Sequence, residues 1–462
     1  MAFAGGKTHM RVLNTVNTEM SNSLAESALF YQSGEHLTTI SHGRGTFVWD
    51  TLGKRYLDAC SGAITCNLGH GHPAIRAAMD QQLDKIAFSY RTQFENQPAK
   101  DLAEKIVSLT QGGLHRVFLV GSGSEAVEAS IKLARQYFVA RAETQRRWFV
   151  SLRPSYHGST LGALGLTGYH PLEEPFSDIM SSSVKVPSPD FFRMTEANEA
   201  DHVECMLDIT KRRVEAIGGD KVIAVVLEPV GGASTGARML NQQYFDGIRA
   251  LCNSWGCLLI LDEVLTGLGR TGKWFAYQHW NAVPDVMALA KGLGAGYYPV
   301  GAAVAKRDIV DTVCRNGGFQ HGHTYAGNPL AGATALAAIR SVENDGLLSN
   351  VQSRGAQLRS GLDDLKNKYN IIGDVRGIGL LQAVELTQNR ESKQPFPVEL
   401  NVFNRVTRIA RSRGLLIYPR RCLDGRAGDH FLVTPPLNIS QEEVVTLLDL
   451  LDCTLADLVD TL

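Results

Sequence analysis

The chain has 462 residues, and at about 150 residues per domain this length predicts two or three domains. Its 46 lysine and arginine residues are balanced by 47 aspartate and glutamate residues, which excludes a basic surface for nucleic acid or an anionic membrane. The longest apolar runs, such as 222–227 and 257–261, fall far below the roughly 20 residues that span a bilayer, so no membrane protein is expected.

The N-terminal segment, up to about Glu35, is polar and weakly periodic, as is typical of an arm that orders against another part of a protein. Residues 1–16 contain no continuous apolar stretch, so we expect no secretory signal and a cytoplasmic location. Residues 42–57 place two β-prone runs on either side of 50–53, which predicts a hairpin.

From Pro73 onward, helical segments alternate with short apolar strands. The predicted strands are 117–120, 148–151, 222–227, 258–261 and 286–290. This alternation predicts an α/β fold in which helices cover both faces of a mostly parallel sheet. Ligands of such sheets bind beyond the carboxyl ends of the strands, so we expect the catalytic residues there.

The C-terminal third is predicted to begin with a long helix from Pro329 to about Asn344, followed by mixed strands and helices. The last helix is predicted to start at Ser440, because Glu443 three residues later completes a capping box. The leucine stripe along this helix is interpreted as core packing.

A segment of small residues, 121–126 (Gly-Ser-Gly-Ser-Glu-Ala), links the first strand of the alternating region to a helix. Backbone N–H groups at such a helix N-terminus bind phosphate groups. The segment also matches the dinucleotide pattern G-x-G-x-x-A, so an NAD-dependent oxidoreductase is an alternative. A tight turn without a ligand is another.

Two ionisable residues follow later strands. Asp262 follows the strand 258–261, where a carboxylate can keep a ligand nitrogen protonated, and capping of the next turn is an equal alternative. Lys291 follows the strand 286–290, and burial there lowers the pKa of a lysine, as a nucleophile or base requires. A phosphate loop, a carboxylate for a ring nitrogen and a Schiff-base lysine, in this order, indicate pyridoxal phosphate.

No metal site is predicted. The eight cysteines form no C-x-x-C pair, so reduced and mostly buried thiols are expected. The histidine pairs at 70 and 72 and at 321 and 323 have no carboxylate or cysteine at ligand spacing, and structural roles are favoured for them.

Six motifs in order make the chain resemble the class III, or omega, aminotransferases of the fold type I pyridoxal phosphate enzymes, from about Gly34 to the last helix. The motifs are Ser122-Gly123-Ser124-Glu125-Ala126, Tyr156-His157-Gly158, Glu228-Pro229-Val230, Asp262-Glu263-Val264 with Thr266-Gly267, Leu289-Ala290-Lys291-Gly292, and His323-Thr324-Tyr325 with Gly327-Asn328-Pro329. The resemblance implies a large cofactor-binding domain at 73–330 with a mostly parallel seven-stranded sheet. It implies a smaller α+β domain formed by 1–72, which includes the N-terminal arm, and by 331–462.

The resemblance also assigns roles to individual residues. Lys291 forms the Schiff base and moves the proton between the substrate carbon and the cofactor carbon. Asp262 pairs with the pyridinium nitrogen, Val264 packs on one face of the ring, and Tyr156 stacks on the other. The further cofactor contacts implied are Ser122, Gly123 and Ser124 at the phosphate, His157 and Glu228 near the ring, and Thr324 at the phosphate of the neighbouring subunit. A homodimer with active sites shared across its interface follows from the role of Thr324.

The C-terminal segment departs from relatives that bind 2-oxoglutarate. Those relatives often place an arginine where Leu432 stands, whereas relatives that use pyruvate carry one in the loop before Gly-Asp-His, where this chain has Arg426. We therefore expect Arg426 to bind the substrate carboxylate, with Arg420 and Arg421 as neighbouring alternatives. The other residues expected along the substrate pocket, with a plain core position as the alternative, are Ala63, Ile64, Phe88 and Tyr90.

These residues predict a transaminase that moves an amino group from an amine or omega-amino acid to a keto acid, with pyruvate favoured, in a ping-pong mechanism. A decarboxylase, racemase or mutase of the same fold is the alternative, although the dialkylglycine decarboxylases usually have tryptophan at the position of Tyr156. An NAD-dependent oxidoreductase is a remote alternative, because it leaves Lys291 and Asp262 without a role.

Overall fold

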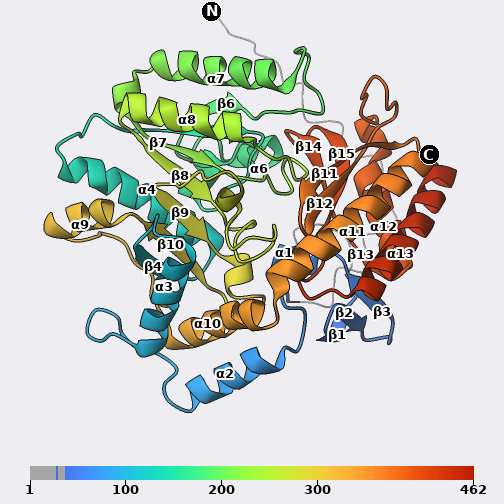
Figure 1. Ribbon diagram of the computed structural model, residues 1–462, viewed down its shortest axis with the longest axis horizontal. Coiled ribbons are helices and arrows are strands. Elements are labelled where there is room, and N and C mark those ends of the chain that lie inside the picture. The colour runs from blue at the N-terminus through green and yellow to red at the C-terminus, as the bar shows by residue number, and fades with distance from the viewer. Residues whose placement is uncertain (1–27, 30–36) are drawn as a thin grey trace, which may run out of the picture.

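The computed structural model describes residues 28–29 and 37–462. The predicted N-terminal arm lies almost entirely outside the described residues, as does the whole of 1–16, on which the cytoplasmic prediction rests. Figure 1 shows two parts side by side: a large α/β layer structure, and a smaller part built from the orange to red C-terminal elements and the blue strands β1 to β3 (Ile40–Arg44, Phe47–Asp50 and Arg55–Asp58).

A seven-stranded sheet forms the centre of the larger part, in the order β4-β10-β9-β8-β7-β5-β6. Its strands are β4 (Arg116–Val120), β5 (Trp148–Arg153), β6 (Val184–Pro187), β7 (Val222–Leu227), β8 (Leu258–Asp262), β9 (Val286–Leu289) and β10 (Gly301–Ala305). Strand β10 is antiparallel to both of its neighbours, and the other pairs are parallel. The predicted mostly parallel sheet is confirmed.

Helices pack on both faces of this sheet. The helices of this part are α2 (Pro73–Leu83), α3 (Gln97–Leu109), α4 (Gly123–Ala140), α5 (Leu161–Leu166), α6 (His170–Glu173), α7 (Glu199–Glu215), α8 (Gln242–Trp255), α9 (Arg307–Arg315) and α10 (Pro329–Asn344). Ala224 and Val226 of β7 belong to the same core as α4 and α9. Val225 and Leu227, which point to the opposite face, belong to the core that includes α3, α7, α8 and α10.

Two four-stranded sheets form the smaller part, in the orders β1-β2-β3-β13 and β11-β12-β15-β14. The further strands are β11 (Ile372–Ile378), β12 (Leu381–Leu386), β13 (Leu415–Leu416), β14 (Tyr418–Leu423) and β15 (Ala427–Val433). The predicted hairpin is present as β2 and β3. Strand β3 pairs in parallel with β13, so Leu57 lies beside Leu415 and the N-terminal strands are joined to the C-terminal segment.

The helices of the smaller part are α1 (Ser61–Ile64), α11 (Leu347–Lys368), α12 (Val402–Ser412) and α13 (Gln441–Thr461). The capping box predicted for the last helix is confirmed: Ser440 Oγ accepts the Glu443 N–H at 3.1 Å, and Glu443 Oε2 accepts the Ser440 N–H at 2.8 Å. The leucine stripe is buried in the core of this part, as interpreted from its spacing.

Two strands of the large sheet escaped the sequence analysis. Strand β10 reads Gly-Ala-Ala-Val-Ala, which is poor in the branched and aromatic residues that favour strands. Strand β6 is short and contains Lys185 and Pro187. Within 28–29 and 37–462, no helix combines the length and apolar character that a bilayer crossing requires.

Candidate active site

Four parallel strands bring the predicted site residues to one edge of the large sheet. Strands β5, β7, β8 and β9 run in the same direction, so the residues that follow them meet. Tyr156 and His157 come after β5, Glu228 directly after β7, Asp262 at the end of β8 and Lys291 shortly after β9. Apart from the adjacent Tyr156 and His157, these residues lie far apart in the sequence.

Asp262 is buried, with 6% of its surface exposed. Its Oδ2 lies 2.9 Å from His157 Nδ1, and its Oδ1 accepts a 3.1 Å hydrogen bond from the Val264 N–H. The His157 ring is fully buried, and its Nε2 has no hydrogen-bond partner within the described part of the chain. The imidazole thus orients a carboxylate that can stabilise a protonated ring nitrogen.

Glu228 fixes the backbone on two sides of the site. Its Oε2 accepts a 3.0 Å hydrogen bond from the Tyr156 N–H, and its Oε1 accepts one of 3.0 Å from the Gly232 N–H. Burial raises the pKa of Glu228, His157 opposes this change, and the charge of Asp262 adds to it. The loop that carries Tyr156 is therefore held by a carboxylate from the neighbouring strand.

Lys291 lies half-buried just beyond β9, in left-handed backbone with a φ of 42°. Such backbone is uncommon for a residue with a side chain and concentrates at functional sites. Burial lowers the pKa of Lys291, and the charges of Asp262 and Glu228 oppose this change. A lowered pKa increases the fraction of neutral amine, which is the form that attacks a carbonyl carbon.

The N-terminus of α4 forms a cradle for a phosphate group. The first N–H groups of a helix have no partners within it, so those of Gly123 and Ser124 are free to bind an anion. Ser122 Oγ accepts the Glu125 N–H at 3.2 Å and so caps the helix. A Cβ on Gly123 would lie 2.9 Å from a methyl carbon of Val264, so glycine suits this close approach. This cradle, the Asp262 carboxylate and the Lys291 amine fit the phosphate, ring nitrogen and aldehyde of pyridoxal phosphate.

Tyr156 and Val264 border this cradle from different strands. Tyr156 is 38% exposed, and its hydroxyl lies 3.1 Å from Ser159 Oγ. The Ser159 N–H donates to Ser124 Oγ at 3.1 Å, which ties the loop after β5 to the phosphate cradle. The contacts of Tyr156 and Val264 with the two ring faces stay predictions.

Phe88, Tyr90 and Thr324 lie on the surface of the chain. Phe88 packs edgewise on Tyr325, with ring centroids 5.9 Å apart. The exposed fractions are 39% for Phe88, 55% for Tyr90 and 65% for Tyr325, so the core alternative is wrong for Phe88 and Tyr90. These aromatic residues form an exposed apolar surface next to Thr324.

The three arginines considered for carboxylate binding differ in their surroundings. Arg421 donates to Asp429 Oδ1 at 3.1 Å and to the Val398 carbonyl at 2.9 Å, so its guanidinium is occupied within the smaller part. Arg426 is exposed at the turn between β14 and β15, and Arg420 is exposed on β14. Arg426 and Arg420 therefore have the accessible guanidinium groups.

Leu432, at the position of the fixed arginine of some relatives, is fully buried. It belongs to an apolar cluster with Ile64, Val230 and Ala237. Ile64 is 2% exposed, whereas the neighbouring Ala63 is exposed. Ala63 is therefore accessible, whereas Ile64 occupies the core position that was its alternative.

Two buried charged residues near the site, Glu263 and Arg270, have no role predicted from the sequence. Glu263 is fully buried, burial raises its pKa to about 7, and it accepts the Ala276 and Tyr277 N–H groups at 2.9 and 2.8 Å. Arg270 is fully buried and donates to the Leu380 carbonyl at 3.1 Å. A charged residue within the glycine-rich run 267–272 is a signal that could have singled out Arg270. Glu263 stands in the motif Asp262-Glu263-Val264, where the sequence assigns it no role of its own.

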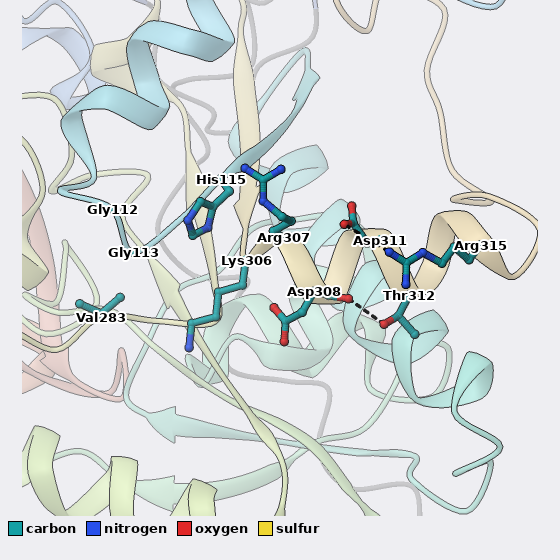
Figure 2. A pocket seen from close by; sticks show the side chains of 10 residues that line it. All are labelled: Gly112, Gly113, His115, Val283, Lys306, Arg307, Asp308, Asp311, Thr312 and Arg315. Atoms are coloured by element: carbon teal, nitrogen blue, oxygen red, sulfur yellow. Dashed lines mark hydrogen bonds and ion pairs between the residues drawn. The ribbon is translucent and has the colours of Figure 1, made fainter.

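A separate cavity of about 650 Å³ lies where β10 leads into α9 (Figure 2). Its lining residues are Gly112, Gly113, His115, Val283, Lys306, Arg307, Asp308, Asp311, Thr312 and Arg315. Lys306 pairs with Asp285 at 2.7 Å, and Arg315 approaches Asp311 at 3.9 Å. The lining includes none of the predicted site residues, and we assign it no ligand.

The chain is similar to known aminotransferases in its sequence. The profile described as aminotransferase class-III matches residues 30–455. An uncharacterized aminotransferase of Bacillus subtilis (strain 168) is 37% identical over 90% of this chain and 94% of its own length. An adenosylmethionine-8-amino-7-oxononanoate aminotransferase of Staphylococcus aureus is 33% identical over 90% of this chain and 91% of its own length.

Solved structures show the same similarity. An amine transaminase from an uncultivated Pseudomonas species, in its PLP-bound form, has a TM-score of 0.88 and 30% identity, and covers 94% of this chain and 99% of its own. An (S)-enantioselective omega-transaminase from Thermomicrobium roseum has a TM-score of 0.87 and 31% identity, with coverages of 96% and 97%.

Proposed function

Because this chain belongs to the class III aminotransferases, we propose that it moves an amino group from an amine or omega-amino acid to a keto acid and favours pyruvate over 2-oxoglutarate. The observation that supports transamination is the meeting of the Lys291 amine, the Asp262 carboxylate and the phosphate cradle of α4 at one sheet edge. The family uses pyridoxal phosphate.

Each residue of the site has a separate role in the proposed reaction. When bound, pyridoxal phosphate supplies an electron sink for the charge that develops on the substrate carbon. Gly123 and Ser124 hold its phosphate through backbone N–H groups, and Asp262 keeps its ring nitrogen protonated. Lys291 holds the cofactor at rest and then carries a proton to and from the substrate carbon. Glu228 holds the backbone of Tyr156 by a hydrogen bond, and the Tyr156 side chain would lie beside the cofactor ring.

The preference for pyruvate is supported by Leu432. It is fully buried among Ile64, Val230 and Ala237, so this position offers no guanidinium to a second carboxylate. Burying the distal carboxylate of 2-oxoglutarate without such a partner would cost free energy.

A panel of amine donors scored against pyruvate and 2-oxoglutarate tests this proposal. Transfer to pyruvate with at least one donor, faster than to 2-oxoglutarate, is the expected result. Decarboxylation or racemisation without net transfer would favour the alternative reactions of this fold, and a dependence on added NAD would favour the oxidoreductase.

Arg426→Ala is expected to weaken the half-reaction with pyruvate by about tenfold to a hundredfold. A charged hydrogen-bonding interaction contributes roughly 1.5–3 kcal/mol, which corresponds to that factor. The half-reaction with an amine that carries no carboxylate should change little, because such a donor never uses the guanidinium. Single-turnover absorbance measurements separate the two halves.

Arg420→Ala and Arg421→Ala are the matched controls for Arg426. Arg421 is already paired with Asp429, so Arg421→Ala should lower the stability of the protein. The ratio of the rates of the two half-reactions should stay unchanged. Equal losses in both halves for Arg426→Ala would show a structural role. A selective loss of the pyruvate half in Arg420→Ala instead would assign the carboxylate to Arg420.

We also propose that the active unit is a homodimer. The exposed apolar surface of Phe88, Tyr90 and Tyr325 supports this, because a second copy of the chain would remove it from water. Thr324 is exposed directly before Tyr325, and in the proposed dimer it would serve the phosphate of the partner.

Mixing two inactive variants tests the shared site. Lys291→Ala and Thr324→Ala chains should form heterodimers in which one site carries both defects and the other carries neither. Partial activity is therefore expected to return as subunits exchange. If both parents are inactive and exchange is verified, an absence of recovery would contradict the proposal.

The domain division that we propose is 73–330 for the large domain, with 1–72 and 331–462 contributing to the small one. The pairing of β3 with β13 and the separate cores of the two parts support it.

A further inference from the structure

We propose that Asp58 and Arg270 are positioning residues which hold the segment 58–67 as a wall of the substrate pocket and thereby set which amine sizes the enzyme accepts. This inference rests on the proposed function. Asp58 is the first residue of this segment, and Arg270 contacts the segment at Ser61 and Asn67.

The segment has a strained backbone that needs external support. Ser61, Gly62 and Ile64 have φ angles of 47°, 63° and 60°. A positive φ is a genuine outlier for a β-branched residue such as Ile64, and such conformations cost about 1–3 kcal/mol each. The backbone keeps this conformation only because contacts with surrounding residues offset its cost.

Asp58 supplies the first support. It is 2% exposed, and its carboxylate accepts the Gly62 N–H at 2.9 Å and the Cys60 N–H at 3.3 Å. His70 Nε2 lies 3.4 Å from the same carboxylate. A buried carboxylate that gathers N–H groups from its own loop fixes the turn at Ser61 and Gly62.

Arg270 supplies the second support. It is fully buried, and its Nη2 donates to Asn67 Oδ1 at 2.7 Å and to Ser61 Oγ at 3.4 Å. Ser61 Oγ in turn donates to the Thr434 carbonyl at 2.7 Å. Arg270 therefore ties both ends of the turn to the smaller part of the protein.

The segment held in this way contacts the stretch that carries Lys291. A Cβ on Gly292 would collide with the Asn67 amide, and a Cβ on Gly296 would lie 2.7 Å from Cys66 Sγ. Ala63 is exposed at the bend between these contacts and the Asp58 turn. A shift of the turn therefore moves Ala63 relative to the reacting amine, while the α4 phosphate cradle stays in place.

Asp58→Asn tests the inference, because the amide keeps the shape of the side chain and replaces one acceptor oxygen by a donor that opposes the Gly62 N–H. The readout is the ratio of kcat/KM for isopropylamine to that for 1-phenylethylamine, with pyruvate as acceptor. We expect this ratio to change by about 2- to 10-fold, the effect of one hydrogen bond. Hydrogen exchange of peptides covering 58–67 should accelerate in the same variant.

Asp50→Asn is the matched control. Asp50 is 3% exposed and accepts the Leu52 and Lys54 N–H groups at 2.9 Å each, but it caps the turn between β2 and β3. This variant should keep the wild-type ratio of the two amines. If Asp58→Asn does not fold, Ser61→Ala removes only the hydroxyl that links Arg270 to Thr434 and should shift the ratio in its place.

Proportional losses for both amines in Asp58→Asn, or an equal shift of the ratio in Asp50→Asn, would overturn the inference. If the wild-type protein transfers no amine at all, the proposed function fails, and hydrogen exchange decides the positioning role separately. Faster exchange confined to 58–67 then supports the role of Asp58, and unchanged exchange overturns it.

Discussion

Lys291→Ala is expected to produce a folded protein that binds pyridoxal phosphate without a covalent bond and loses nearly all transamination. Lys291 follows β9 with a pKa lowered by burial, as suits a residue that moves a proton at the substrate carbon. A positioned acid–base group contributes about 10²- to 10⁴-fold to the rate, and we expect a loss of at least that size. Turnover with the best amine of the donor panel and pyruvate measures it.

Lys185→Met is the matched control for this variant. Burial lowers the pKa of Lys185 to about 7, and its ammonium donates to the Gly165 and Thr167 carbonyls at 2.9 and 2.6 Å. Its loss should lower the Tm and leave the change of cofactor absorbance on borohydride treatment intact. Near-normal turnover of Lys291→Ala would contradict the assignment, as would a borohydride-sensitive absorbance that persists in Lys291→Ala.

Asp262→Asn is expected to lower turnover by roughly 10²- to 10⁴-fold. A loss of this size corresponds to about 2.7–5.5 kcal/mol of transition-state stabilisation, as expected when one preorganised electrostatic group is removed. The amide cannot stabilise a protonated ring nitrogen, and His157 loses the carboxylate that lies 2.9 Å from its Nδ1. The absorbance maximum of the bound cofactor should shift as well, which separates a change at the ring from a loss of folded protein.

Asp285→Asn serves as the control for Asp262. Asp285 precedes β9, at the opposite end of the same sheet, and pairs with Arg249 at 2.8 Å and Lys306 at 2.7 Å. This variant should lose stability without a change in the cofactor spectrum. If Asp262→Asn left the absorbance spectrum of the bound cofactor unchanged, the contact of Asp262 with the ring nitrogen would be contradicted.

The position of the catalytic edge could be predicted from the sequence for a local reason. The strands β7, β8 and β9 are short apolar runs, and Glu228, Asp262 and Lys291 are the first charged residues at or after their carboxyl ends. Parallel strands share a direction, so Glu228, Asp262 and Lys291 had to meet once the alternation of strands and helices was recognised. Strand β10 escaped because its small residues carry a weak signal.

The supports of the site could not be predicted in the same way. Asp58 and Arg270 act through contacts with residues such as Gly62, Asn67 and Leu380, and no local pattern announces such partners. The reach of Thr324 to a partner subunit and the contact of Arg426 with a carboxylate depend on molecules outside the single chain. They stay predictions for the same reason.

The pairing of β3 with β13 has a consequence for biosynthesis. The hydroxyl of Thr46 donates to Glu443, 397 positions later in the chain, and β3 gains its second neighbour only from Leu415 and Leu416. During translation, β3 can pair with β2 early. Its other edge stays unpaired until β13 has been synthesised, when nearly the whole polypeptide has left the ribosome. The large sheet can assemble earlier. The strained turn after Asp58 reaches its final shape only at the end, when the Ser61 hydroxyl can donate to the Thr434 carbonyl. Chains released early would carry an assembled sheet and an unfinished pocket, and their open strand edges would expose them to aggregation and to proteases.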